Sequence, residues 1–198
     1  MLNLKEYVNN AFTYEEYRQL GKDLVEQGKT TGYEQSESRI HFTRLNDKRM
    51  DRLDKTIQLD AAQLAQLKEY KSDSIFFVIT EMWCGDSAAI IPLLHKITQA
   101  HRRIRLLIIL RDENPELMDE YGTNGTSSIP KLILLNRQFE KLGIWGPRPA
   151  HAQEMMLNWK AQPVGPKSEV DEAIQRWYIE DKGQSIIKEI LDLLTNQS

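Results

Sequence analysis

The sequence predicts an α/β fold in which a central mixed sheet is flanked by helices, with helical additions at the N- and C-termini. Two short apolar runs, residues 74–80 and 104–110, have the composition of strands that are buried on both faces. Residues 84–101 between them have the apolar periodicity of a helix, so a right-handed crossover should make the two strands parallel. A hairpin pattern around Asn136-Arg137 adds antiparallel strands, which makes the sheet mixed.

Helix start signals dominate the N-terminal section. Thr13 and Glu16 have the spacing of a capping box, in which each side chain bonds the backbone of the other. Asp60 and Gln63 repeat that signal for a later helix. Between the two helices, apolar residues alternate with polar ones over residues 39–46, and this alternation predicts a short strand.

These patterns divide one compact unit into three sections. Residues 1–73 form a mainly helical N-terminal extension packed on the core, residues 74–161 form the core, and residues 162–198 form a C-terminal helical extension. The last extension is expected to be interrupted at Gly183.

Composition and charge exclude several classes of protein. The 198 residues include 26 basic and 29 acidic side chains, so the net charge of −3 offers no global attraction for nucleic acid. No apolar run approaches the roughly 20 residues that cross a bilayer, and the first residues lack the pattern of a signal peptide. Cys84 is the single cysteine and cannot form an internal disulfide, which favours the reducing cytoplasm. We expect no nucleic-acid or membrane partner and, since the four histidines lack ligand spacing, no metal. The oligomeric state stays open.

The chemistry is expected at Cys84, which follows a buried strand and opens a helix. The free N–H groups and the positive end of the helix dipole favour a thiolate there. Asp86 opposes this effect, because a solvated carboxylate about 4 Å away costs the thiolate about 1 kcal/mol. The pKa of Cys84 should therefore fall below ~8.5 by about one unit or less.

The segment Trp83-Cys84-Gly85-Asp86-Ser87 resembles the thioredoxin active-site pattern W-C-G-P-C. Asp86 stands in place of the proline and Ser87 in place of the second cysteine, which makes this a monothiol variant. The likeness covers roughly residues 74–160 and continues, in the family's order, through Pro92, Asn114-Pro115, Tyr121-Gly122, Ile129-Pro130 and Gly146. The chain is thus identified as thioredoxin-like.

The resemblance implies a thioredoxin-like central sheet and a cytoplasmic protein that exchanges thiols and disulfides through one nucleophile. Cys84 would attack a protein or small-molecule disulfide and form a mixed disulfide, which an external thiol would release. Ser87 would assist as a second catalytic group by donating a hydrogen bond to the thiolate. No cofactor is implied, although a low-molecular-weight thiol can act as the external reductant.

The resemblance also implies a substrate-binding surface made of Trp83, Gly85, Asp86, Ile129 and Pro130. In thioredoxin-like folds the proline is cis and faces the nucleophile. The backbone of Ile129 would pair with an extended substrate chain as an added strand.

Departures from the family pattern keep two alternatives open. The resolving cysteine is absent and Val78 stands where thioredoxins carry a buried aspartate, so the chain could be a redox-inert module that binds peptides or proteins. The sequence C-G-D-S is also similar to the C-G-F-S of glutaredoxins that carry a glutathione-ligated iron–sulfur cluster. Against that reading, Ser128-Ile129-Pro130 replaces their T-V-P, and no G-G-x-D follows. Whether the chain is an oxidoreductase or a binding module stays open at this point.

Overall fold

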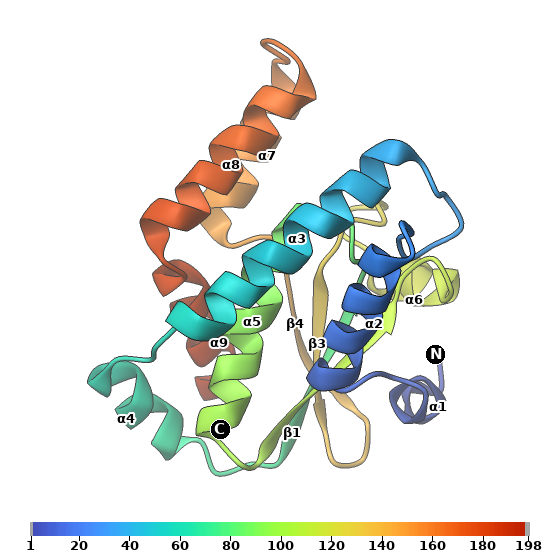
Figure 1. The fold of residues 1–198 in the computed structure, drawn as a ribbon. Coiled ribbons are helices and arrows are strands. Elements are labelled where there is room, and N and C mark those ends of the chain that lie inside the picture. The colour runs from blue at the N-terminus through green and yellow to red at the C-terminus, as the bar shows by residue number, and fades with distance from the viewer. Residues whose placement is uncertain (1, 197–198) are drawn as a thin grey trace.

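Four strands form one mixed sheet at the centre of residues 2–196, the part of the chain that this computed structural model describes (Figure 1). The first residue of the predicted section 1–73 and the last two of section 162–198 lie outside that range. The strands are β1 (Ser74–Thr80), β2 (Ile104–Leu110), β3 (Lys131–Asn136) and β4 (Lys141–Trp145), in the spatial order β2-β1-β3-β4. β1 is parallel to β2 and antiparallel to β3, and β3 is antiparallel to β4. The predicted α/β fold with a mixed sheet is confirmed.

Strand β1 is the structural centre because all seven of its residues are buried. Phe76 and Val78 point into one hydrophobic cluster, and Phe77 and Ile79 point into another on the opposite face. Its uniformly apolar sequence therefore reflects a strand covered on both sides.

The helices form two unequal layers over this sheet (Figure 1). The larger cluster receives side chains from α2, α3, α4, α5, α7, α8 and α9, whereas the smaller one receives them from α1 and α6. Their bounds are α1 (Leu4–Asn9), α2 (Tyr14–Glu26), α3 (Glu37–Thr56), α4 (Ala61–Glu69), α5 (Gly85–Ala100), α6 (Pro115–Tyr121), α7 (Ala150–Ala161), α8 (Lys167–Asp181) and α9 (Gln184–Thr195).

Local signals set several of these helix ends. Both capping boxes predicted from the sequence are present, at Thr13 for α2 and at Asp60 for α4. The predicted interruption near Gly183 is also confirmed, since this residue adopts φ +79° between α8 and α9. A Cβ at Gly183 would lie only 2.5 Å from a methyl group of Leu93, so the break packs directly against α5.

The strand predicted over residues 39–46 is wrong, because these residues lie inside α3. Ser36 caps this helix by accepting a hydrogen bond from the Arg39 amide. The buried side of α3 consists of Thr43, Asn46 and Met50. Two of these three side chains are polar, which hides the helical periodicity from a search for apolar residues.

Polar residues of the N-terminal section hold the loop that follows β1. The hydroxyl of Thr31 accepts a hydrogen bond of 2.9 Å from the Met82 amide. The side-chain amide of Asn46 donates one of 2.9 Å to the Met82 carbonyl. Both contacts are buried, so the N-terminal section fixes the backbone two residues before Cys84.

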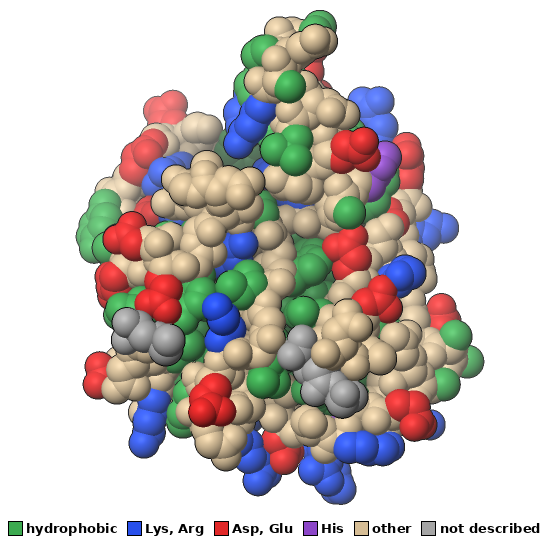
Figure 2. Space-filling view, turned by 180° about the vertical axis from the view of Figure 1, so that it is seen from behind, with side chains coloured by type: hydrophobic (Ala, Val, Ile, Leu, Met, Phe, Trp, Pro, Cys, Tyr) green, Lys and Arg blue, Asp and Glu red, His purple; other side chains and the backbone are tan. Residues whose placement is uncertain are grey.

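Acidic and basic side chains are interspersed on the face seen from behind, where neither sign forms a continuous patch (Figure 2). Within residues 2–196, no helix combines the length and the apolar character that crossing a membrane requires.

We predict that Asn46→Ala lowers the free energy of unfolding by about 1–3 kcal/mol, because it removes the buried hydrogen bond to the Met82 carbonyl. Urea unfolding measures this loss. Asn158→Ala makes the same chemical change at an exposed position of α7 and should cost much less. Equal losses in the two variants would contradict the role assigned to Asn46.

Candidate active site around Cys84

Cys84 lies between the end of β1 and the start of α5, for which it is the N-cap residue. Its thiol donates a hydrogen bond of 3.4 Å from Sγ to the carbonyl oxygen of Ile129. The peptide bond between Ile129 and Pro130 is cis. The structure therefore brings together residues 84, 129 and 130, which the sequence analysis grouped by resemblance alone. Cys84 is only 8 % exposed and belongs to the smaller hydrophobic cluster.

Burial, and after it the charge of Asp86, raise the pKa of Cys84 to about 11. The Ser87 hydroxyl and the backbone amides of Ser87 and Asp86 oppose this rise by hydrogen bonding to the sulfur. The expected fall in pKa is therefore wrong in direction. The helix amides and Ser87 act as expected, but the loss of hydration at a buried sulfur outweighs them.

Asp86 is buried rather than solvated, which is the second reason why the expected fall in the pKa of Cys84 is wrong. Its Oδ2 lies 2.6 Å from Nη2 of Arg148, and its Oδ1 accepts a hydrogen bond of 3.0 Å from the Tyr178 hydroxyl. Arg148 comes from the turn before α7 and Tyr178 from α8. The residue that replaces the family's proline thus joins the first turn of α5 to the C-terminal extension. Burial raises the pKa of Asp86, and Arg148 opposes that rise.

Ser87 is placed by the last residue of β1. The Thr80 hydroxyl donates a hydrogen bond of 2.6 Å to the Ser87 oxygen, within the buried interior. A serine hydroxyl that accepts one bond still carries its own proton to donate. Ser87 is therefore oriented to donate toward Cys84.

Trp83 is partly exposed, and two arginines lie over its ring. The guanidinium carbon of Arg39 is 4.2 Å from the ring centroid and that of Arg111 is 4.8 Å from it. Both arginines form ion pairs with Asp112. Because Arg39 belongs to α3 and Arg111 follows β2, the indole contacts cations from both the N-terminal section and the core.

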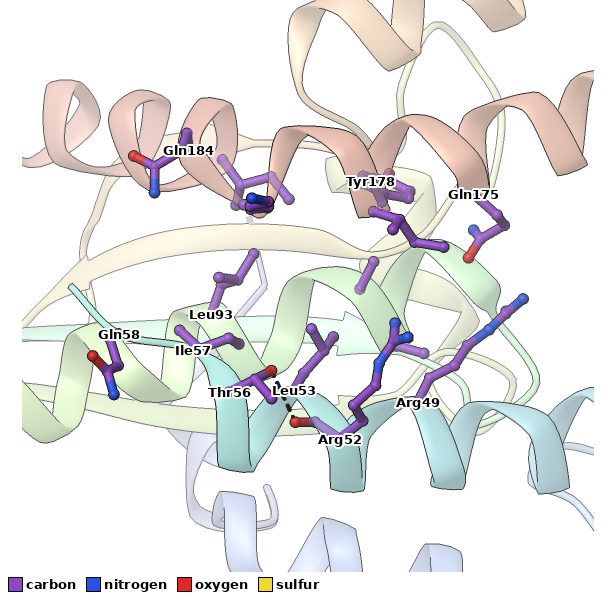
Figure 3. A pocket seen from close by; sticks show the side chains of 16 residues that line it. Arg49, Arg52, Leu53, Thr56, Ile57, Gln58, Leu93, Gln175, Tyr178 and Gln184 are labelled. Atoms are coloured by element: carbon purple, nitrogen blue, oxygen red, sulfur yellow. Dashed lines mark hydrogen bonds between the residues drawn. The ribbon is translucent and has the colours of Figure 1, made fainter. Parts of the chain in front are cut away.

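Gly85 faces side chains from both extensions. A Cβ at this position would lie 3.2 Å from the Gln175 amide nitrogen and 3.6 Å from Nη1 of Arg49. Helices α3 and α8 therefore bound the first turn of α5 on one side, as their side chains in Figure 3 also show.

Sequence reasoning missed four charged or polar residues around this site. Lys131 is buried beside Pro130, where its ammonium donates to the Thr123 hydroxyl and to the Gly146 carbonyl, and burial lowers its pKa. Glu81 is fully buried and accepts a hydrogen bond of 2.7 Å from the Asp112 amide, and burial raises its pKa. The sequence did hold a signal for these two residues, because Lys131 opens the apolar strand β3 and Glu81 directly follows the apolar strand β1. Arg148 and Tyr178 had no local signal.

A family model described as Thioredoxin matches residues 32–162, so the match reaches beyond the core to include α3 and α4. A protein of unknown function from Pseudomonas aeruginosa, solved by crystallography, is 18 % identical with a TM-score of 0.63, and the match covers 94 % of this chain and 99 % of that one. An HIV epitope-scaffold is 17 % identical with a TM-score of 0.59, covering 93 % and 99 %. These two likenesses show the fold alone. A search of curated proteins found no match.

We predict that alkylation of Cys84 by iodoacetamide keeps accelerating as the pH rises towards about 11, because only the thiolate reacts and the pKa of the buried thiol is about 11. Intact-mass time courses at increasing pH measure the rate. The same protein unfolded in denaturant is the control, and its rate should level off near the ordinary thiol value of ~8.5. A folded protein that levels off at or below the unfolded one would overturn the assignment.

We predict that Asp86→Asn lowers the pKa of Cys84, because it removes a nearby negative charge and leaves the positive charge of Arg148 uncompensated. The same unpaired charge should reduce the free energy of unfolding by about 3–5 kcal/mol. The alkylation profile and urea unfolding measure the two effects. Asp119→Asn, on the exposed side of α6, is the matched control. A Cys84 profile that is unchanged or moved to higher pH would contradict this electrostatic account.

Proposed function

The chain belongs to the thioredoxin family, and from this premise we propose that it performs thiol–disulfide exchange through the single thiol of Cys84, by way of a mixed disulfide. The observation that carries the proposal is the distance of 3.4 Å between Sγ of Cys84 and the carbonyl oxygen of Ile129. It supports a site in which a reacting sulfur lies beside a backbone group that can hold a substrate.

The Ile129 carbonyl supports binding of an extended substrate. In the resting thiol this oxygen accepts the hydrogen bond from Cys84. A thiolate or disulfide sulfur has no proton to donate, so the oxygen becomes free to accept from a substrate backbone amide. Such pairing would add the substrate as a short strand next to the reacting sulfur.

In the exchange step, Cys84 first loses its proton to water. Sγ then attacks one sulfur of a protein or small-molecule disulfide, a new S–S bond forms, and the old one breaks. The second substrate sulfur leaves as a thiolate and takes up a proton. Since Cys84 is the single cysteine, an external thiol must attack the mixed disulfide to restore the free thiol. We propose that a low-molecular-weight thiol of the cytoplasm acts as this external thiol.

The raised pKa of Cys84 should make both steps of this exchange slow. At neutral pH a thiol with a pKa of about 11 is almost wholly protonated, so attack is slow. The same high pKa makes Cys84 a poor leaving group, so release of the mixed disulfide is slow as well. We therefore propose slow capture of a disulfide substrate as a long-lived adduct rather than rapid turnover.

A redox-inert binding module is the second candidate, and the burial of Cys84 favours it. With 8 % exposure and a raised pKa, the thiol is poorly placed to meet a substrate sulfur. In this case the surface beside Ile129 and Trp83 would bind a peptide or protein without a covalent step.

We predict that the reduced protein, incubated with glutathione disulfide or a peptide disulfide at mildly alkaline pH, gains the mass of one adduct that an added thiol removes. Cys84→Ser should gain none, because a hydroxyl is nearly isosteric with the thiol but a far poorer nucleophile. Ser87→Ala should form the adduct more slowly, because it removes the hydroxyl that favours the thiolate. No adduct in the wild type, combined with reversible peptide binding that Cys84→Ser retains, would reject exchange in favour of the binding module.

A further inference from the structure

A cavity of about 510 Å³ lies beside helix α5, between α3 and the break that joins α8 to α9 (Figure 3). Its volume falls within the roughly 300–1,000 Å³ that small-molecule sites occupy. Cys84 and Ile129 do not line it. A ligand could therefore occupy this cavity whether or not Cys84 exchanges disulfides.

The middle of this cavity is apolar. Leu53 comes from α3, Ile57 directly follows that helix, Leu93 comes from α5 and Ile186 comes from α9. In Figure 3, Leu93 points from α5 towards the break between α8 and α9, where its methyl groups pack against Gly183. Such a lining favours the apolar part of a ligand, because its burial removes hydrocarbon from water.

The charges around the cavity are all positive. Among residues 2–196, the charged residues that line it are Arg49, Arg52 and Lys182, with no aspartate or glutamate. This contrasts with the net charge of −3 for the whole chain. The cavity therefore complements a ligand that is negatively charged.

The two arginines have no acidic partner among the ion pairs of residues 2–196. Arg49 is half-buried and donates a hydrogen bond of 3.2 Å to the Asn46 side chain. Burial and the neighbouring charge of Arg52 lower the pKa of Arg49, as expected of a cation that lacks a counter-ion. An anion bound here would offset both the cost of burying the Arg49 charge and its repulsion by Arg52.

The labelled polar side chains lie at several places around the cavity. In Figure 3, Arg49 and Arg52 reach from α3 towards Gln175 and Tyr178 of α8, whereas Gln184 lies at the opposite end. The cavity thus has two arginines at one end and apolar side chains beside them.

We propose that this cavity binds a small amphipathic carboxylate, whose charged group lies between Arg49 and Arg52 and whose apolar chain runs over Leu93. The arginines supply charge-assisted hydrogen bonds to the carboxylate oxygens. The apolar middle selects against small inorganic anions, and the positive charges select against cationic amphiphiles.

The test is a fluorescence titration with anilinonaphthalene sulfonate, an aromatic amphipathic anion, followed by its displacement with decanoate. The wild type should bind the dye and release it to decanoate, whereas decyltrimethylammonium and inorganic phosphate should displace it far less. The double variant Arg49→Gln, Arg52→Gln should bind decanoate about tenfold or more weakly, since it loses the charge-assisted hydrogen bonds. Arg44→Gln, an exposed position of α3 outside the cavity, should leave the affinity unchanged.

A second variant tests the apolar middle. Ala89→Phe places a ring at the cavity wall and should weaken decanoate binding by about tenfold through loss of space while keeping both arginines. Circular dichroism and urea unfolding confirm that each variant is folded.

Three results would overturn the proposal. One is equal affinity for decanoate in the wild type and the double arginine variant. Another is displacement by inorganic phosphate as effective as that by decanoate, which indicates a site for anions alone. The third is a change of oligomeric state in Ala89→Phe, seen by light scattering with dye binding unchanged, which indicates that a second copy of the chain covers this surface.

Discussion

The buried ion pair between Asp86 and Arg148 is the interaction on which the candidate site depends. Its oxygen–nitrogen distance is 2.6 Å, and the Tyr178 hydroxyl completes the bonding of the carboxylate. Removing two charges from water is costly, so such a pair does little for overall stability compared with apolar packing. What it provides is position: one carboxylate in the first turn of α5 holds both the turn before α7 and the helix α8. The same carboxylate places a negative charge near Cys84, which raises the pKa of the thiol beyond the effect of burial.

Both extensions take part in building the site rather than merely covering the sheet. Thr31 and Asn46 of the N-terminal section bond the backbone of Met82, and Arg39 stacks on Trp83. On the C-terminal side, α8 reaches the first turn of α5 through Tyr178. The cavity that we assign to an amphipathic carboxylate lies between these two extensions, next to the same helix. A thioredoxin-family core thus carries two neighbouring regions, one around the Cys84 sulfur and one between α3, α5 and α8, and Tyr178 belongs to both.

Much of the fold followed from local patterns. The buried strands, the crossover helix, the hairpin and the two capping boxes were predicted correctly, because each depends on residues close together in the chain. The strand predicted over residues 39–46 failed for a specific reason. Thr43 and Asn46 are buried by hydrogen bonding rather than by apolar packing, and a search for apolar periodicity does not detect such residues.

By itself, the sequence determined the architecture of the sheet, the position of Cys84 at the start of a helix, and the likeness of its neighbours to a thioredoxin motif. Only the tertiary structure decided the properties of that cysteine. Its hydrogen-bond acceptor Ile129 is 45 residues away, and the Tyr178 hydroxyl that bonds Asp86 is 92 residues from its partner. Periodicity and capping act over a few residues, whereas burial and charge depend on every element packed against a group. For that reason the helix was predictable from the sequence, and the raised pKa of the thiol at its start was not.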